Sequence, residues 1–137
     1  MIHETVLQWK SGMAFETELD GHILTLDADE SSGGNNTGMR PKKLMLTALA
    51  GCTGMDVVSI LKKMKIEPES FAVRVDGKLT EEAPKYYETM HIIYEFGGKN
   101  LPLDKLQKAI ELSQEKYCGV SALYKKAIKI TYEIRIK

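Results

Sequence analysis

The sequence lacks an excess of either charge, because its 19 lysine and arginine residues equal its 19 aspartate and glutamate residues. A balanced chain has no broad basic surface for nucleic acid or for an anionic membrane. No unbroken apolar run reaches the length of a membrane span, and the N-terminal segment MIHETVLQWK lacks the residue order of a signal peptide. We therefore expect a cytoplasmic protein that binds neither nucleic acid nor membranes.

Motifs for metals, phosphates and hydrolysis are also missing. His3, His22 and His91 lie far apart, and no CxxC or HxxxH spacing offers a set of zinc ligands. The sequence has no GxSxG elbow and no phosphate-binding GKS or GKT. A Cys-His-Asp site stays open, since such residues meet only in space. We predict no metal and no cofactor, and we interpret the histidines as surface or strand-face residues.

What is present is an ordinary globular composition, with 43% hydrophobic and 28% charged residues in 137 positions. That length suits one domain with one core, so we expect residues 1–137 to form a single domain.

Hydrophobic periodicity and turn residues predict a chain of strands and helices. Glycine turns at Ser11-Gly12 and Asp20-Gly21 divide the first strands, and Pro41 and Pro102 each open a helix. The last strand alternates apolar and polar residues, which is typical of an antiparallel strand with one buried face. Segregated strands and helices favour an α+β fold. The expected order is strands within 3–27, a flexible loop at 29–38, a helix at 41–65, strands at 71–79 and 87–96, a helix at 102–116, a helical turn at 119–125 and a strand at 128–137.

The first predicted helix is apolar around most of its circumference, which is typical of a buried helix. Ala48, Ala50, Gly51 and Gly54 make its surface thin near Cys52, so another backbone can approach there. A chain of this length has little material to cover such a helix, and a homodimer that covers it is the simpler solution.

The chain has two cysteines, Cys52 and Cys118. Free cysteine is often a small buried hydrophobe, and composition alone favours that interpretation. The functional interpretation requires both thiols in one site, with one attacking as thiolate and the other resolving the sulfenic acid into a disulfide. Spacing permits this meeting but does not show it.

The segments around the cysteines carry a family resemblance. RPKKLMLTALAGCTGMDVVSIL (residues 40–61) and LSQEKYCGVSALY (residues 112–124) resemble the two cysteine regions of the OsmC/Ohr family. The resemblance implies an OsmC-like fold, with an antiparallel sheet and two long central helices in an intertwined homodimer. It also implies reduction of organic hydroperoxides, in which Cys52 attacks, Cys118 resolves and a dithiol restores the enzyme.

The sequence departs from the family pattern at the cation that activates the attacking thiol. The family's peroxidases hold an arginine of the N-terminal strands with a glutamate ten residues before the first cysteine. Lys42 stands at the glutamate position, and residues 1–39 contain no arginine. Lys10, Lys42 or an Arg40 of the partner subunit would have to supply the positive charge that lowers a thiol pKa.

Two functions follow. The first is a thiol-dependent peroxidase for organic hydroperoxides in oxidative-stress defence. The second is a redox sensor, or a protein that binds a small apolar ligand, on the same scaffold.

Overall fold

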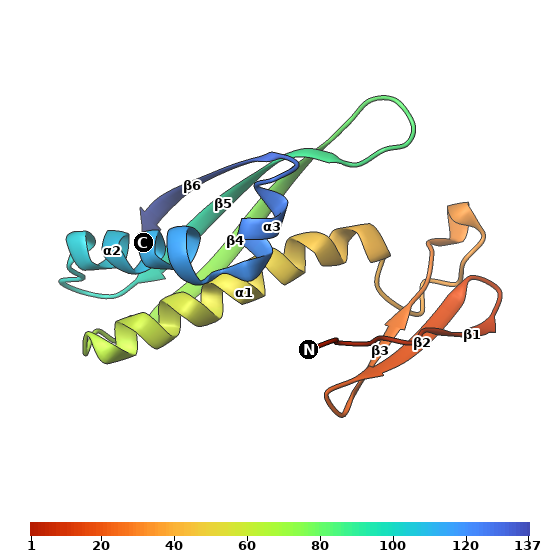
Figure 1. The fold of residues 1–137 in the computed structure, drawn as a ribbon, viewed down its shortest axis with the longest axis horizontal. Helices are drawn as coiled ribbons and strands as arrows, with labels where there is room; N and C mark the ends of the chain where they lie inside the picture. Colours follow the sequence, from red (N-terminus) through yellow and green to blue (C-terminus); the bar gives the residue numbers. More distant parts are fainter. The chain divides into compact units, whose positions relative to one another are not determined.

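The computed structural model describes residues 1–137 and divides into two compact units, Met1–Met45 and Leu46–Lys137. Each unit contains one three-stranded sheet (Figure 1). Together with three α-helices, these sheets confirm the predicted α+β class.

The N-terminal unit is built on an antiparallel meander of β1 (Gln8–Ser11), β2 (Ala14–Leu19) and β3 (His22–Leu26). Asp20 and Gly21 both have positive φ, at 50° and 80°. That conformation matches the twist of the strands it joins, and aspartate and glycine tolerate it best. The hairpin predicted at this dipeptide is therefore confirmed.

The segment after β3 folds around one side chain, that of Asp27. Its carboxylate accepts hydrogen bonds from the backbone N–H groups of Ala28, Asn35 and Thr37 and from the Thr37 hydroxyl. A short 3₁₀ turn, η1 (Glu30–Ser32), lies inside this loop. The hydrogen bonds from Thr37 are the largest of the causes that lower the pKa of Asp27 from its ordinary 3.8 to about 2.

The C-terminal unit packs one side of the long helix α1 against a sheet and shorter helices. Its sheet has the strand order β4-β5-β6, and β4 pairs with β5 in antiparallel register. The bounds are α1 (Pro41–Lys63), β4 (Ser70–Leu79), β5 (Tyr87–Gly97), α2 (Leu103–Leu112), a π-helical turn η2 (Ser113–Tyr117), α3 (Gly119–Tyr124) and β6 (Lys129–Ile136).

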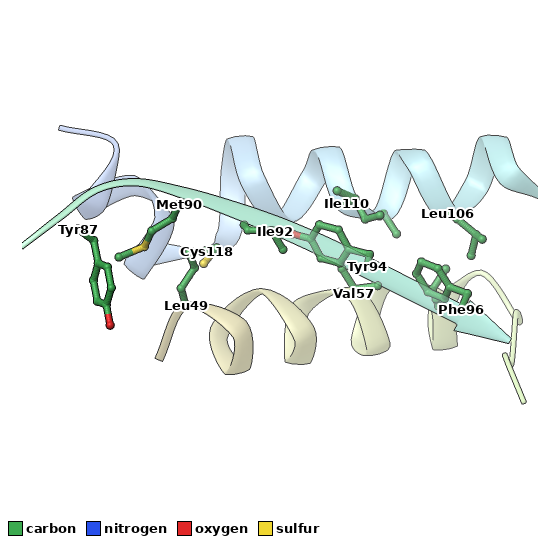
Figure 2. Packing of buried hydrophobic residues seen from close by; sticks show 12 residues of the cluster. Leu49, Val57, Tyr87, Met90, Ile92, Tyr94, Phe96, Leu106, Ile110 and Cys118 are labelled. Atoms are coloured by element: carbon green, nitrogen blue, oxygen red, sulfur yellow. The ribbon is translucent and has the colours of Figure 1, made fainter. Parts of the chain in front are cut away.

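The core of this unit lies between the two longer helices and one face of the sheet. Met90, Ile92, Tyr94 and Phe96 alternate along the central strand β5, so all four point to the same face. Side chains of α1 and α2 pack against them (Figure 2). Phe71 of β4 stacks on Phe96 with 4.6 Å between ring centroids.

One prediction about the sheet is wrong. We expected the last strand to be antiparallel, but β6 pairs with β5 in parallel register, from Thr89 opposite Lys129 to Phe96 opposite Ile136. The chain leaves β5 at Gly97, returns through α2 and enters β6 at the end of the sheet where β5 begins, which is the crossover that parallel strands require. The alternation in β6 reflects helices that cover only one face of the sheet, and it carries no information about strand direction.

Helix α1 is buried along one stripe and exposed elsewhere. Leu49, Thr53, Val57 and Leu61 recur every four residues and are buried. Met55 is 76% exposed and Val58 is 53% exposed, although both are apolar. We expected α1 to be buried on most sides. Within one chain, only the stripe that faces the sheet and α2 is buried.

By length and composition alone, α1 is also apolar enough to cross a membrane, with a mean hydropathy of 1.8 over its most apolar window. This corrects the expectation from unbroken apolar runs, because interspersed Thr, Gly and Ser interrupt a run but barely lower the average. Core helices pass the same test, and the buried stripe of α1 belongs to the core.

The loop around Asp27 predicts a specific dependence of stability on pH. Asp27→Asn removes the charge that four donors converge on, so we expect a lower melting temperature at neutral pH. A carboxyl whose folded-state pKa is depressed stabilises the fold above its unfolded value and loses that contribution as the pH falls through the folded value. The difference in melting temperature between wild type and Asp27→Asn should therefore shrink as the pH falls from 3.8 to about 2.

Thermal unfolding followed by circular dichroism across this range measures the effect. Asp20→Asn is the matched control, because the exposed Asp20 lies in a turn that asparagine also tolerates. If the difference in melting temperature between wild type and Asp27→Asn stayed constant down to pH 2, the stabilising role of the Asp27 carboxylate would be contradicted.

Candidate functional site

The two cysteines lie on different elements of the C-terminal unit. Cys52 is half-buried near the middle of α1. Cys118 is 3% exposed and stands immediately before α3, where its sulfur accepts a hydrogen bond from the Ser121 N–H at 3.3 Å. Cys118 and Leu49 of α1 belong to the same buried cluster (Figure 2). Both cysteines are free thiols.

A widened helical turn places Cys118 there. In η2, the Cys118 N–H donates to the Ser113 carbonyl at 2.7 Å, which is the i to i+5 bond of a π-helix. The extended backbone of Cys118 then ends the helix and begins α3. Such turns often mark functional sites.

The structure brings Cys52, Cys118 and Asp56 together. One ligand atom from each residue, the two sulfurs and a carboxylate oxygen, lies within 4.8 Å of the other two. Cys52 and Asp56 share a helix face because they are four residues apart. The meeting that the cysteine spacing only permitted therefore occurs in the fold, while the catalytic roles of the two thiols stay predictions.

Burial governs the chemistry of the inner thiol. Desolvation raises the pKa of Cys118, and the neighbouring Cys52 and Asp56 raise it further. Its hydrogen bond from the Ser121 N–H acts in the opposite direction. At neutral pH Cys118 is therefore a protonated thiol, whereas Cys52 is the more accessible of the two sulfurs.

A buried hydrogen-bonded network adjoins the thiols. The Thr53 hydroxyl lies 2.6 Å from the Tyr94 hydroxyl and 2.7 Å from that of Ser113. Ser113 donates to Asp56 at 2.9 Å. The Gln114 amide donates to Thr53 and Tyr94, at 3.2 and 3.0 Å. These bonds join α1, β5 and η2, and Asp56 connects them to the cysteine pair.

The same cluster is the part of the chain with the donor set for a metal. Two sulfurs and one carboxylate would provide three ligands of a tetrahedral zinc site. The group holds three such residues where a closed structural site uses four. Its Cys118 sulfur also accepts the Ser121 N–H, and Asp56 accepts from Ser113.

Two of the three candidate cations, Lys10 and Arg40, have partners of their own. In the N-terminal unit, Lys10 pairs with Glu16 at 3.8 Å, and Arg40 donates to the Gly38 carbonyl at 2.8 Å. In the C-terminal unit, Arg74 and Arg135 pair with Asp76 and Glu133. Both arginines lie on the sheet face that the helices do not cover, because core residues alternate with them along β4 and β6.

Sequence reasoning missed the polar part of the site. Asp56 was visible as part of the first cysteine segment, and its four-residue spacing from Cys52 could have singled it out. Thr53, Tyr94 and Gln114 offered no such signal, because their hydroxyl and amide groups meet only after three elements pack.

Comparisons with known proteins agree with this geometry. The sequence model of the OsmC-like protein family matches residues 33–133. Protein YhfA of Escherichia coli K12 is 29% identical over 131 residues, which are 95% of each protein. A crystal structure of a hypothetical protein from Aquifex aeolicus VF5 is 32% identical and has a TM-score of 0.83, covering 100% of this chain and 98% of that one.

The organic hydroperoxide resistance protein OhrB of Bacillus subtilis shares the fold, with a TM-score of 0.63 at 17% identity over 97% of this chain and 98% of that one. The family match covers most of the chain, including both cysteines and the network between them. The chain belongs to the OsmC-like protein family.

Proposed function

We propose that this protein is a thiol-dependent peroxidase that reduces organic hydroperoxides in oxidative-stress defence. The observation that carries the proposal is the pairing of a half-exposed Cys52 with a buried Cys118, their sulfurs within 4.8 Å. An accessible thiol can meet a peroxide, and a sheltered thiol next to it can resolve the product.

The reaction balances with these two thiols and an external dithiol. The Cys52 thiolate attacks one peroxide oxygen, the O–O bond breaks, and the other oxygen leaves as the alcohol after taking a proton. Cys52 is thereby oxidised to a sulfenic acid. Cys118 attacks that sulfur, water leaves and a disulfide forms. A dithiol reduces the disulfide and restores both thiols.

The names of fold relatives support the substrate class. Organic hydroperoxide resistance proteins from Legionella pneumophila and Bacillus subtilis share this fold, with TM-scores of 0.67 and 0.63. We carry their named role over as a proposal, because their identities of 16% and 17% show the fold alone.

A redox sensor is the second candidate, and Asp56 is the observation that favours it. A carboxylate beside two thiols opposes formation of a thiolate, whereas a peroxidase benefits from a nearby cation. A sensor needs only one oxidation for each signal. The alternative of a small apolar ligand is supported by a groove of about 700 Å³ along α1, lined by Gly51, Gly54, Met55 and Val58 among others.

We assign that groove to a second copy of the chain. Its lining combines thin glycine positions with exposed apolar side chains, and a Cβ at Gly51 would meet no atom within 4 Å. Burial of such a surface in a homodimer removes apolar area from water. We further propose a single domain over residues 1–137, a cytoplasmic location, and a cation for Cys52 from Lys10, Lys42 or Arg40 of the partner subunit.

Peroxide turnover tests the function. With cumene hydroperoxide and dithiothreitol, we expect steady consumption by wild type and a loss of at least about a hundredfold in Cys52→Ser, because the nucleophile is gone. Cys118→Ser should retain the first oxidation and stop at a sulfenic acid. Equal turnover by wild type and Cys52→Ser would reject the peroxidase. One oxidation without turnover would favour the sensor.

Oligomeric state tests the assignment of the groove. Met55→Glu places a charge on the exposed apolar side of α1, where burial of an unpaired carboxylate is costly. We expect a dimeric wild type and a dissociation constant at least about tenfold higher for the variant, by sedimentation across a concentration series. Leu103→Glu is the matched control, because Leu103 is an exposed helix residue outside the groove. A monomeric wild type would rule out the dimer.

A further inference from the structure

The direction of every hydrogen bond in the buried network follows from counting protons. The Ser113 hydroxyl donates its one proton to Asp56, at 2.9 Å. Its oxygen must therefore accept from Thr53, at 2.7 Å. Because Thr53 donates its own proton to Ser113, it accepts from the Tyr94 hydroxyl at 2.6 Å. The chain of donors runs in one direction and ends on the Asp56 carboxylate.

Two further contacts fix the start of this chain. The Ser121 hydroxyl donates to the side-chain oxygen Oε1 of Gln114 at 2.7 Å. This bond turns the Gln114 NH₂ group toward Tyr94 and Thr53. Burial raises the pKa of Tyr94 to about 12, so its hydroxyl remains a donor. All buried polar side-chain atoms of the protein have a partner. Aligned hydroxyl dipoles of this kind strengthen one another in a buried site.

This arrangement holds Asp56 in one orientation beside the reacting atoms. One carboxylate oxygen, Oδ2, accepts the Ser113 proton. The carboxylate lies within 4.8 Å of both Cys52 and Cys118. It is therefore a carboxylate that the structure places next to both thiols.

Disulfide formation requires a proton to move between these two sulfurs. Cys118 is a protonated thiol, because burial raises its pKa, and it must lose that proton to form the S–S bond. The hydroxyl on the Cys52 sulfenic acid must gain a proton to leave as water. A carboxylate close to both sulfurs can take the first proton and deliver the second, directly or through one bridging water.

We propose that Asp56 is the proton carrier of the disulfide-forming step. Cys118 supplies the electron pair of the new S–S bond while its proton passes to the Asp56 carboxylate. The S–O bond of the Cys52 sulfenic acid breaks, its oxygen keeps the bonding pair, and the proton passes from Asp56 to that oxygen. The products are a disulfide, one water and an unchanged carboxylate. This inference rests on the proposed function, because it concerns the second half of that reaction.

The test separates sulfenic acid formation from its resolution. Reduced protein is mixed with one equivalent of cumene hydroperoxide and quenched at intervals. Mass spectrometry then measures the Cys52 sulfenic acid, trapped with dimedone, and the Cys52–Cys118 disulfide. In Asp56→Asn we expect the disulfide to form about a hundredfold more slowly and the sulfenic acid to accumulate. Glu115→Gln is the matched control, because it removes an exposed carboxylate from the neighbouring turn η2.

The pH profile distinguishes proton transfer from a structural role. With Asp56 carrying the proton, the wild-type rate should be flat between about pH 6 and pH 8. In Asp56→Asn, disulfide formation depends on the fraction of Cys118 present as thiolate. The rate of disulfide formation in this variant should therefore rise about tenfold for each pH unit. Asp56→Glu retains a carboxylate and should restore much of the flat profile. Ser113→Ala, which removes the hydroxyl that orients Asp56 and accepts from Thr53, should show partial slowing if Asp56→Asn proves too unstable to purify.

The two proposals fail in different ways. If cumene hydroperoxide does not oxidise wild-type Cys52, the peroxidase is rejected, and excess hydrogen peroxide is used to make the same sulfenic acid. The rates of disulfide formation in wild type and Asp56→Asn then decide the role of Asp56. Equal resolution by wild type and Asp56→Asn, with the same pH profile, would overturn it under either oxidant.

Discussion

The C-terminal unit depends on a contact that Thr53 makes in its core. This residue is fully buried in the stripe of α1 that faces the sheet, and its hydroxyl joins Tyr94 of β5 to Ser113 of η2. An unpaired buried hydroxyl would cost about 1–3 kcal/mol, so the three elements must meet in one register to satisfy it. Apolar packing alone tolerates small shifts, whereas these short bonds do not.

That register also places the reactive groups. Cys52 comes directly before Thr53, and Asp56 lies one helical turn after Cys52. Ser113 begins the π-helical turn that carries Cys118. A fixed Thr53 therefore positions both thiols and the carboxylate at once. The polar core orients the site, at the cost of desolvating hydroxyl groups that a purely apolar core would not contain.

The electrostatics of the site suit the second half of a thiol redox cycle better than the first. A carboxylate and a buried environment both keep Cys118 protonated. They favour a resolving thiol that waits until a sulfenic acid forms next to it. Activation of Cys52 calls for a positive charge, and the arginines of the C-terminal unit lie on the opposite face of its sheet, paired with acids. In the proposed dimer, the exposed apolar side of α1 is also where a partner would bring such a charge.

Local patterns in the sequence determined the order of the elements, the hairpin at Asp20-Gly21 and the proline-initiated start of α1, because each depends on neighbouring residues. They also determined the family, through the segments around Cys52 and Cys118. Only the tertiary structure decided the parallel pairing of β6, since alternation reports which face is buried and is the same for either direction. It alone brought Asp56 and Thr53 into the site, because hydrogen bonds between α1, β5 and η2 depend on how distant segments pack.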